Sequence, residues 1–216
     1  MRLIRHNRIP NGIFAATLTI VAIMAMGASP AYAAVDCVVG PGVTQTRTTV
    51  IGTNGNDTID CGGAKPGKKI NGKGGNDTIT GSNFDDVING DRGNDTMTGG
   101  RGRDIVSGNH GRDTITGSGG HDVMYGNAGN DTLTGSAGVG NDRMKGGPGE
   151  DTLNGGSGPD FMNGGPGVDI LKGDGGDDVL KGRSDDQSVD SLDGGPGQDT
   201  CQGPAPDGDT LTSCNP

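Results

Sequence analysis

Aspartate is the residue type whose number and spacing in this sequence could support chemistry. The chain has 27 acidic residues, of which 26 are aspartate and one is Glu150. Sixteen aspartates fall in one series whose commonest spacing is nine residues: Asp57, Asp77, Asp86, Asp95, Asp104, Asp113, Asp122, Asp131, Asp142, Asp151, Asp160, Asp169, Asp178, Asp190, Asp199 and Asp209. The aspartate carboxylate is a hard oxygen ligand on a short side chain that favours turns. The series therefore predicts repeated binding of a cation such as calcium.

Apolar residues and glycines keep the same phase as the aspartates. Lys68 takes the aspartate position of one degenerate unit, so the series has 17 units and 16 gaps, of which 12 are nine residues long. The second residue after each position is apolar throughout. Glycine stands two residues before the position in 13 units and four residues after it in 15. Chance composition would not hold three residue types in one phase, so the series is a structural repeat.

Each unit predicts a glycine-rich turn followed by a short strand with one inward apolar side chain. One inward residue per strand forms no core unless neighbouring units stack, which predicts an all-β solenoid. With two units in each turn of 18 residues, the aspartates alternate between two edges. One edge carries Asp77, Asp95, Asp113, Asp131, Asp151 and Asp169, and the other carries Asp86, Asp104, Asp122, Asp142, Asp160 and Asp178.

Three units show the fullest form of this pattern. Residues 99–106 read Gly-Gly-Arg-Gly-Arg-Asp-Ile-Val, residues 155–162 read Gly-Gly-Ser-Gly-Pro-Asp-Phe-Met, and residues 164–171 read Gly-Gly-Pro-Gly-Val-Asp-Ile-Leu. From residue 53 to about 212 the sequence resembles the hemolysin-type, or repeats-in-toxin (RTX), calcium-binding repeat family. The resemblance implies a right-handed parallel β-roll with several Ca²⁺ ions between successive loops. It implies that the ligands are carboxylates of the series aspartates and loop carbonyls.

Rows of stacked aspartates have an electrostatic consequence. Carboxylates about 5 Å apart repel one another unless a dication lies between them. The roll is therefore predicted to fold only with calcium, because ion binding and ordering of the chain are one event.

Some units depart from the pattern. Lys68 removes a carboxylate and adds a positive charge. Other residues replace the loop glycine before Asp86, Asp190 and Asp209; they are Phe84, Ser188 and Asp207. We expect the first unit and the last two units to bind weakest, and the blocks at residues 95–131 and 142–178 to bind best.

Composition excludes several classes of protein. Only 29% of residues are hydrophobic and there is no tryptophan, which is too little for the core of an ordinary α/β or α+β enzyme. The 17 basic residues are scattered, which argues against a nucleic-acid partner. Low hydrophobicity with a net charge of −10 would indicate disorder if the repeat were not present.

Residues 1–33 are predicted to be an export signal, so the chain is predicted to be secreted and extracellular. They contain Arg2, Arg5 and Arg8, an apolar run at 13–26 and Ala-Tyr-Ala at 31–33. A retained N-terminal anchor is the alternative, and no membrane span is expected after residue 33. Residues 34–52 are predicted to cap the roll with a first strand near 48–51. The roll follows at 53–212, and 213–216 form a C-terminal tail.

Four cysteines follow the export signal, two near each end: Cys37, Cys61, Cys201 and Cys214. An even number in an exported chain favours disulfides, and sequence alone allows three connectivities. Local Cys37–Cys61 and Cys201–Cys214 bridges are the simplest of the three.

The sequence offers no recognisable catalytic motif, so the protein is predicted not to be an enzyme. It contains neither a His-Glu-x-x-His zinc motif nor a Gly-x-Ser-x-Gly elbow. His110 and His121 fall in loops that we expect on opposite edges, where solvated side chains are the simplest interpretation.

The outward strand positions suggest an alternative function. Thr-x-Thr recurs every 18 residues or so, at Thr78/Thr80, Thr96/Thr98, Thr114/Thr116 and Thr132/Thr134. Such a ladder predicts a surface-binding or adhesive module for ice, a glycan or a mineral, with calcium only structural. The opposite face carries an apolar strip that is a candidate partner surface, formed by Val87, Ile105, Val123, Phe161 and Val179. β-Propensity and cross-strand packing account for both rows equally well.

Overall fold

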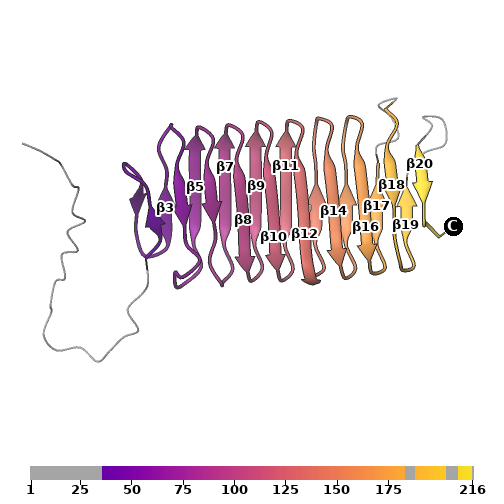
Figure 1. Ribbon diagram of the computed structural model, residues 1–216, viewed down its shortest axis with the longest axis horizontal. Coiled ribbons are helices and arrows are strands. Elements are labelled where there is room, and N and C mark those ends of the chain that lie inside the picture. The colour runs from indigo at the N-terminus through magenta and orange to yellow at the C-terminus, as the bar shows by residue number, and fades with distance from the viewer. Residues whose placement is uncertain (1–35, 183–187, 203–208, 216) are drawn as a thin grey trace, which may run out of the picture. The chain divides into compact units, whose positions relative to one another are not determined.

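In the computed structural model, residues 36–182, 188–202 and 209–215 are described. The predicted export signal therefore lies outside the described residues. Contacts divide the chain into Met1–Ala33 and Ala34–Pro216, and the second unit is a β-solenoid of two sheets (Figure 1). The described residues contain strands and turns and no helix, which confirms the all-β prediction. Consequently none of them forms a helix able to cross a membrane.

The chain alternates between two ten-stranded sheets as it advances along the solenoid. The first sheet contains, in spatial order, β1 (Val38–Val39), β4 (Thr58–Asp60), β6 (Thr78–Thr80), β8 (Thr96–Arg101), β10 (Thr114–Gly119), β12 (Thr132–Val139), β14 (Thr152–Ser157), β16 (Ile170–Gly175), β18 (Ser191–Asp193) and β20 (Thr210–Thr212). The second contains β2 (Thr44–Gln45), β3 (Thr49–Ile51), β5 (Lys69–Gly74), β7 (Val87–Arg92), β9 (Ile105–His110), β11 (Val123–Ala128), β13 (Arg143–Lys145), β15 (Phe161–Asn163), β17 (Val179–Lys181) and β19 (Thr200–Gln202).

Strand pairing confirms that two nine-residue units form one turn. Ile115 pairs with Met97 and with Leu133, which places residues 18 positions apart side by side in the first sheet. The pairs are parallel except at the N-terminal end, where β1 pairs with β4 and β2 pairs with β3 in antiparallel fashion. The strand expected near residues 48–51 is present as β3, which pairs in parallel with β5, but it is not the first strand, because β1 and β2 precede it.

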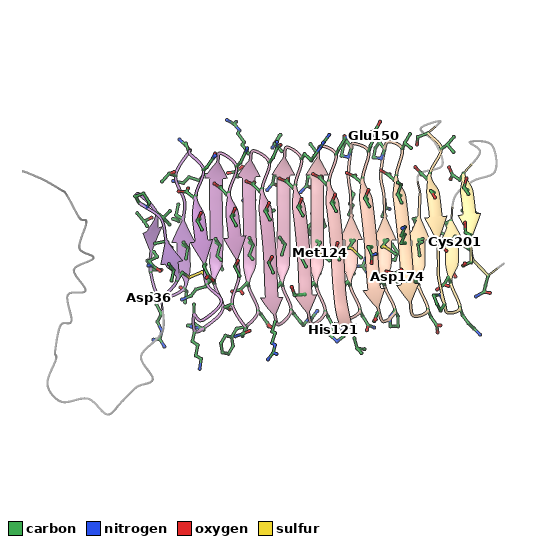
Figure 2. The ribbon with its side chains drawn as sticks, in the orientation of Figure 1. Asp36, His121, Met124, Glu150, Asp174 and Cys201 are labelled. Atoms are coloured by element: carbon green, nitrogen blue, oxygen red, sulfur yellow. A yellow bond between two sulfur atoms is a disulfide. The ribbon has the colours of Figure 1, made fainter. Side chains whose placement is uncertain are left out.

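The core is a double column of apolar side chains, one from each strand. Ile59, Ile79, Met97, Ile115, Leu133, Leu153, Leu171 and Leu192 line the first sheet, while Ile70, Ile88, Val106, Met124, Met144, Met162 and Leu180 line the second; each is at most 2% exposed. Figure 2 shows Met124 inside the roll. Leu211 departs from the pattern because it lies on β20, the last strand of its sheet, and it is 46% exposed. Stacking, not hydrophobicity alone, buries each side chain.

Disulfides join the cysteines near each end of the chain. Cys37 is bonded to Cys61, and Cys201 is bonded to Cys214. Both bridges agree with the local pairing, which was the simplest of the three connectivities.

The outward faces of the two sheets differ. On the first sheet, Thr58, Thr78, Thr96, Thr114, Thr132 and Thr152 are exposed and in register. On the second sheet the corresponding row includes Val87, Ile105, Val123, Arg143, Phe161 and Val179. Arg143 therefore interrupts the predicted apolar strip, because it directly follows Asp142 and so holds the same position in its unit as Val123 and Phe161.

Candidate metal centre

The series aspartates form two rows, one on each edge of the roll. In each row the backbone N–H of one aspartate donates to the Oδ1 of the aspartate in the next turn, for example from Asp95 to Asp113 at 2.8 Å. One row runs through Asp57, Asp77, Asp95, Asp113, Asp131, Asp151, Asp169, Asp190 and Asp209. The other runs from Lys68 through Asp86, Asp104, Asp122, Asp142, Asp160, Asp178 and Asp199. Each of the two sets that the period assigned to opposite edges thus forms a continuous row on its own edge.

The second carboxylate oxygen of most of these residues is buried without a hydrogen-bond donor. Among the described residues this holds for Oδ2 of Asp77, Asp95, Asp104, Asp113, Asp122, Asp131, Asp142, Asp151, Asp160, Asp178, Asp199 and Asp209. A buried polar atom without a partner costs about 1–3 kcal/mol, and more when it is charged. A cation beside these oxygens would remove that cost.

Backbone carbonyls lie close to the unpartnered carboxylate oxygens. A Cβ placed on Gly146 would be 2.2 Å from Oδ2 of Asp151 and 2.7 Å from the carbonyl oxygen of Gly164 in the next turn. At Gly173 the corresponding distances are 2.3 Å to Oδ2 of Asp178 and 2.4 Å to the carbonyl oxygen of Gly194. Glycine at these positions therefore leaves carboxylate and carbonyl oxygens facing one small space between successive turns.

This donor set suits calcium. Calcium takes six to eight oxygen ligands in flexible geometry and accepts backbone carbonyls among them. Within the described part of the chain, no three His, Cys, Asp or Glu side chains gather at one point, as a zinc site would require. Carboxylates from the rows together with loop carbonyls are the residues that would hold the ion.

Electrostatics in the rows favour the same conclusion. Burial, aided by neighbouring carboxylates, raises the pKa of Asp104, Asp113, Asp151 and Asp160 to about 7. The same causes raise the pKa of Asp77 and Asp142 to about 6. Burial also raises the pKa of Asp86, Asp95, Asp122, Asp131 and Asp178. The metal-free roll therefore disfavours the ionised form that an ion requires, and a bound dication would reverse this preference.

The Asp57 and Asp86 loops differ from the loops whose aspartate Oδ2 lacks a donor. The repeat pattern in the sequence did not predict this difference for the two loops together. Oδ2 of Asp57 accepts hydrogen bonds from the backbone N–H of Thr53 at 2.6 Å and from its hydroxyl at 3.0 Å. In the same way, Oδ2 of Asp86 accepts the backbone N–H of Ser82 at 2.5 Å. In both loops the hydroxyl oxygen also accepts an N–H two residues further on, from Gly55 and from Phe84. These loops supply their own donors to the carboxylate, and we call them closed loops.

Backbone conformation separates the closed loops from several loops of regular nine-residue units. Four residues before Asp95, Asp113 and Asp131, the φ angles lie between 74° and 83°; the residues are Asp91, Asn109 and Asn127. Thr53 and Ser82 hold the same position in the closed loops and do not adopt positive φ. Positive φ is the left-handed conformation, and where it occurs the N–H of that residue does not reach the carboxylate.

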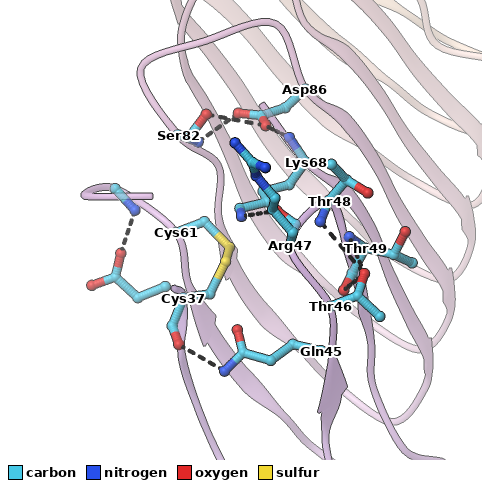
Figure 3. The surroundings of a disulfide bond; sticks show 12 residues. Cys37, Gln45, Thr46, Arg47, Thr48, Thr49, Cys61, Lys68, Ser82 and Asp86 are labelled. Atoms are coloured by element: carbon cyan, nitrogen blue, oxygen red, sulfur yellow. Dashed lines mark hydrogen bonds between the residues drawn. A yellow bond between two sulfur atoms is a disulfide. The ribbon is translucent and has the colours of Figure 1, made fainter. Parts of the chain in front are cut away.

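Lys68 begins the second row and is buried, with 2% exposure. Its backbone N–H donates to Oδ1 of Asp86, and its ammonium Nζ donates to the carbonyl oxygen of Arg47 (Figure 3). The positive charge of Lys68 lowers the pKa of Asp86, against the larger effect of burial. The ammonium of Lys68 therefore acts on the first carboxylate of this row through its charge, without a direct hydrogen bond to it in the described residues.

The histidines lie on opposite edges, as expected, but only His121 is in a loop, because His110 is the last residue of β9. His110 and His121 are exposed, and Figure 2 shows His121 in a loop at one edge, opposite Glu150. Nδ1 of His121 accepts the backbone N–H of Asn141 at 2.9 Å. Burial raises the pKa of Asp122 and Asp142, and His121 offsets part of that rise. Of the weak units expected at the C-terminus, residues 183–187 before Asp190 and 203–208 before Asp209 lie outside the described residues.

Comparison with known families agrees with this geometry. The sequence matches the RTX calcium-binding nonapeptide repeat (4 copies) at residues 46–63, 71–106, 107–139, 134–162 and 163–201, more than half of the chain. The chain belongs to this RTX family. The resemblance seen in the repeat is therefore confirmed, as is the parallel β-roll that it implied. A comparison with curated proteins gave no match. RTX repeats bind calcium, and the buried aspartate rows fit ion binding.

Proposed function

We propose that this protein is a secreted, calcium-binding β-roll whose folding depends on calcium and which catalyses no reaction. The observation that carries the proposal is the set of buried Oδ2 atoms without donors. They repeat along both edges and lie beside loop carbonyls of the adjacent turn. Ions held between successive turns would satisfy these oxygens and join each turn to the next, so that binding contributes directly to folding.

The ligand chemistry favours calcium over other divalent ions. Magnesium demands a tight octahedral shell and keeps several waters, which a stack of carbonyls and carboxylates does not provide. Zinc prefers nitrogen and sulfur ligands, whereas all four cysteines are in disulfides. Disulfides persist in oxidising compartments such as the extracellular space. They support the export that the N-terminal residues predict.

The closed loops divide the aspartates into two groups. We assign ion binding to the aspartates whose Oδ2 lacks a donor, and we assign none to Asp57 and Asp86, because Thr53 and Ser82 already satisfy them. Asp169 and Asp190 remain in the predicted ligand set because they belong to the same row. The assigned ligand set therefore contains fewer aspartates than the full series, whose members hold equivalent positions in the repeat.

The first experiment is far-ultraviolet circular dichroism of the purified protein with its disulfides intact. A cooperative gain of β signal on titration with calcium, and no such gain with magnesium, is the expected result. A β spectrum already complete in the presence of a chelator would reduce calcium to an accessory role. A spectrum that stays disordered at every calcium concentration would reject the proposal.

The assignment of individual sites is tested by counting the ions bound to matched variants. Asp104→Asn replaces an unpartnered Oδ2 with an amide nitrogen, so it should lower the number of calcium ions bound by at least one. Asp86→Asn makes the same change where Ser82 already donates, so it should leave that number unchanged. Equal losses in the two variants, measured by isothermal titration calorimetry, would contradict the division into open and closed loops.

A further inference from the structure

The first three positions of the described strands β3 to β19 in the second sheet hold no acidic residue, although the chain carries 27; Asp91, near the end of β7, is the acidic residue within these strands. At the first and third position of each strand from β3 to β19, the outward residues are Thr49, Ile51, Lys69, Asn71, Val87, Asn89, Ile105, Ser107, Val123, Tyr125, Arg143, Lys145, Phe161, Asn163, Val179, Lys181, Thr200 and Gln202. Four of these positions are cationic, so this face has the opposite charge to the chain as a whole, whose net charge is −10.

Two of the cations flank one aromatic ring, and a third lies on the same strand as one of them. Arg143 and Lys145 lie on β13, and Lys181 lies two strands further along, on β17. Phe161 is on the strand between them, with the Arg143 guanidinium 4.8 Å and the Lys181 ammonium 5.2 Å from its ring centroid. Cation–π contacts of this kind hold charged groups in place and reduce the entropy lost when they bind an anion. We call these four residues the cationic cluster.

A hollow adjoins the cationic cluster. It has a volume of about 180 Å³ and is lined by Val123, Tyr125, Arg143, Met144, Lys145, Phe161 and Asn163. Sites that enclose whole small ligands are larger, at roughly 300–1,000 Å³. The hollow therefore suits one ring of a longer chain that lies across the sheet, with Tyr125 as an apolar wall and the Asn163 amide as a hydrogen-bonding group.

We propose that the cationic cluster binds an acidic polysaccharide. A linear polymer with regularly placed carboxylate or sulfate groups can reach several of the cations at once, because Arg143 and Lys145 are about 7 Å apart along the strand and β13 and β17 about 10 Å apart across the sheet. Arginine and lysine both bind such anions, and arginine does so with two parallel hydrogen bonds. Sugar rings present C–H groups that pack against Tyr125 and polar groups that reach Asn163.

Other anionic polymers fit this face less well. Membrane binding needs apolar side chains that project into the bilayer. The exposed Val87 and Ile105 of this face lie on β7 and β9, outside the cationic cluster, and Phe161 within the cluster is half-buried between two cations. Nucleic acids gain affinity by contacting many phosphates, and the cluster offers three cations on an otherwise acidic molecule.

Calcium strengthens the expected binding, and this step rests on the proposed function. A metal-free chain of charge −10 repels a polyanion at long range. Each bound Ca²⁺ adds two positive charges between the aspartates and leaves the cationic cluster free on the flat outer face. Binding should therefore be strongest for the calcium-loaded roll.

The test is fluorescence anisotropy of labelled chondroitin sulfate with the purified protein in calcium. The cluster variant carries Arg143→Gln, Lys145→Gln and Lys181→Gln. The matched control carries Lys172→Gln, Arg101→Gln and Arg112→Gln, which removes the same charge from other exposed positions. We expect binding at least tenfold weaker in the cluster variant and changed less than twofold in the control. A further variant, Phe161→Leu, keeps all charges and should weaken binding several-fold.

Several outcomes would overturn the proposal: no binding of chondroitin sulfate by the unaltered protein, equal losses in the two triple variants, or equal or tighter binding of single-stranded DNA or phosphatidylglycerol vesicles. Neutral dextran should not bind. Calcium-induced circular dichroism is recorded for every variant, so a variant that fails to fold is recognised, and Phe161→Leu then decides the case. If circular dichroism shows a fold that needs no calcium, the proposed function fails while the comparison of variants still tests the cluster.

Discussion

The stacked carbonyls can be tested by adding one methyl group at Gly120. Gly120 has a φ of +138°, and a Cβ at this position would lie 1.6 Å from the carbonyl oxygen of Gly102 and 2.7 Å from its carbonyl carbon. Both neighbours are backbone atoms of the preceding turn on the same edge. Gly119, the adjacent residue, has ordinary φ, and a Cβ there meets only Cγ of Arg101 at 3.8 Å. The two glycines thus form a matched pair within one loop.

The expected loss in Gly120→Ala has two parts. A non-glycine residue in this region of φ costs about 1–3 kcal/mol. In addition, the Gly102 carbonyl must move by more than an ångström, which disrupts the stacking of this loop on the loop of the next turn. Together these effects should lower the free energy of unfolding in saturating calcium by about 2–4 kcal/mol. A loss of about 1.4 kcal/mol is a tenfold change in the folding equilibrium. Gly119→Ala should change it by less than about 0.5 kcal/mol, as for most surface substitutions.

Urea unfolding followed by circular dichroism measures both variants, and a calcium titration of each reports the midpoint of folding. Gly120→Ala should need more calcium to fold and less urea to unfold than the unaltered protein. Gly119→Ala should match the unaltered protein in both midpoints. Equal behaviour of the two variants would refute the reasoning, because it would mean that the loops do not stack carbonyl on glycine.

Three further predictions follow from the same structure. In chelator, the β signal should be larger at pH 4 than at pH 7.5. Burial raises the pKa of Asp104 and Asp113 to about 7 in the fold, so their contribution to stability is complete below about pH 4 and is lost as pH rises through 7. Calcium should reverse this order, and a β signal that does not change with pH in chelator would contradict the prediction. Replacing Cys37 and Cys61 together by serine opens a loop with a sequence separation of 24 and should cost about 3 kcal/mol in urea unfolding, whereas no loss would mean that the bridge is dispensable. Exchange of four outward threonines for lysine should leave calcium-induced folding intact, and the positions are Thr96, Thr98, Thr114 and Thr116. Loss of binding to ice, a glycan or a mineral surface would then favour the adhesive alternative.

The period of nine was enough to predict the arrangement of the rows and the core. In a solenoid, each residue pairs with its equivalent one turn away, so phase along the sequence becomes position in space. Ile115 lies beside Met97 and Leu133 for this reason alone. The same logic fails at the ends, where a unit has a neighbour on one side only. Leu211 is exposed because no later strand of its sheet covers it.

The closed loops could not be predicted from the aspartate and glycine positions. The Asp57 loop keeps glycine two residues before the aspartate, so that position does not predict a closed loop there. The replacement of this glycine by Phe84 distinguishes only the Asp86 loop. A hydroxyl residue is not sufficient either, because Ser118 holds the same position with a φ of 83°. Both closed loops read hydroxyl residue then asparagine, Thr53-Asn54 and Ser82-Asn83, and the hydroxyl forms a local turn in each. The distinction lies in a local competition between side-chain and backbone hydrogen bonds.

The closed loops and Lys68 both lie at the N-terminal end, where an ion would be poorly held. An ion between turns needs oxygens from two of them, and the first turn has no repeat unit before it. Here the chain supplies other partners: Thr53 donates to Asp57, Ser82 donates to Asp86, and Lys68 places a buried ammonium near that second carboxylate. Unsatisfied carboxylate oxygens begin only at Asp77 in one row and at Asp104 in the other. The need for a cation therefore starts where successive repeat turns stack, and the disulfide-linked first turn meets the same electrostatic demand with its own hydrogen bonds and a lysine.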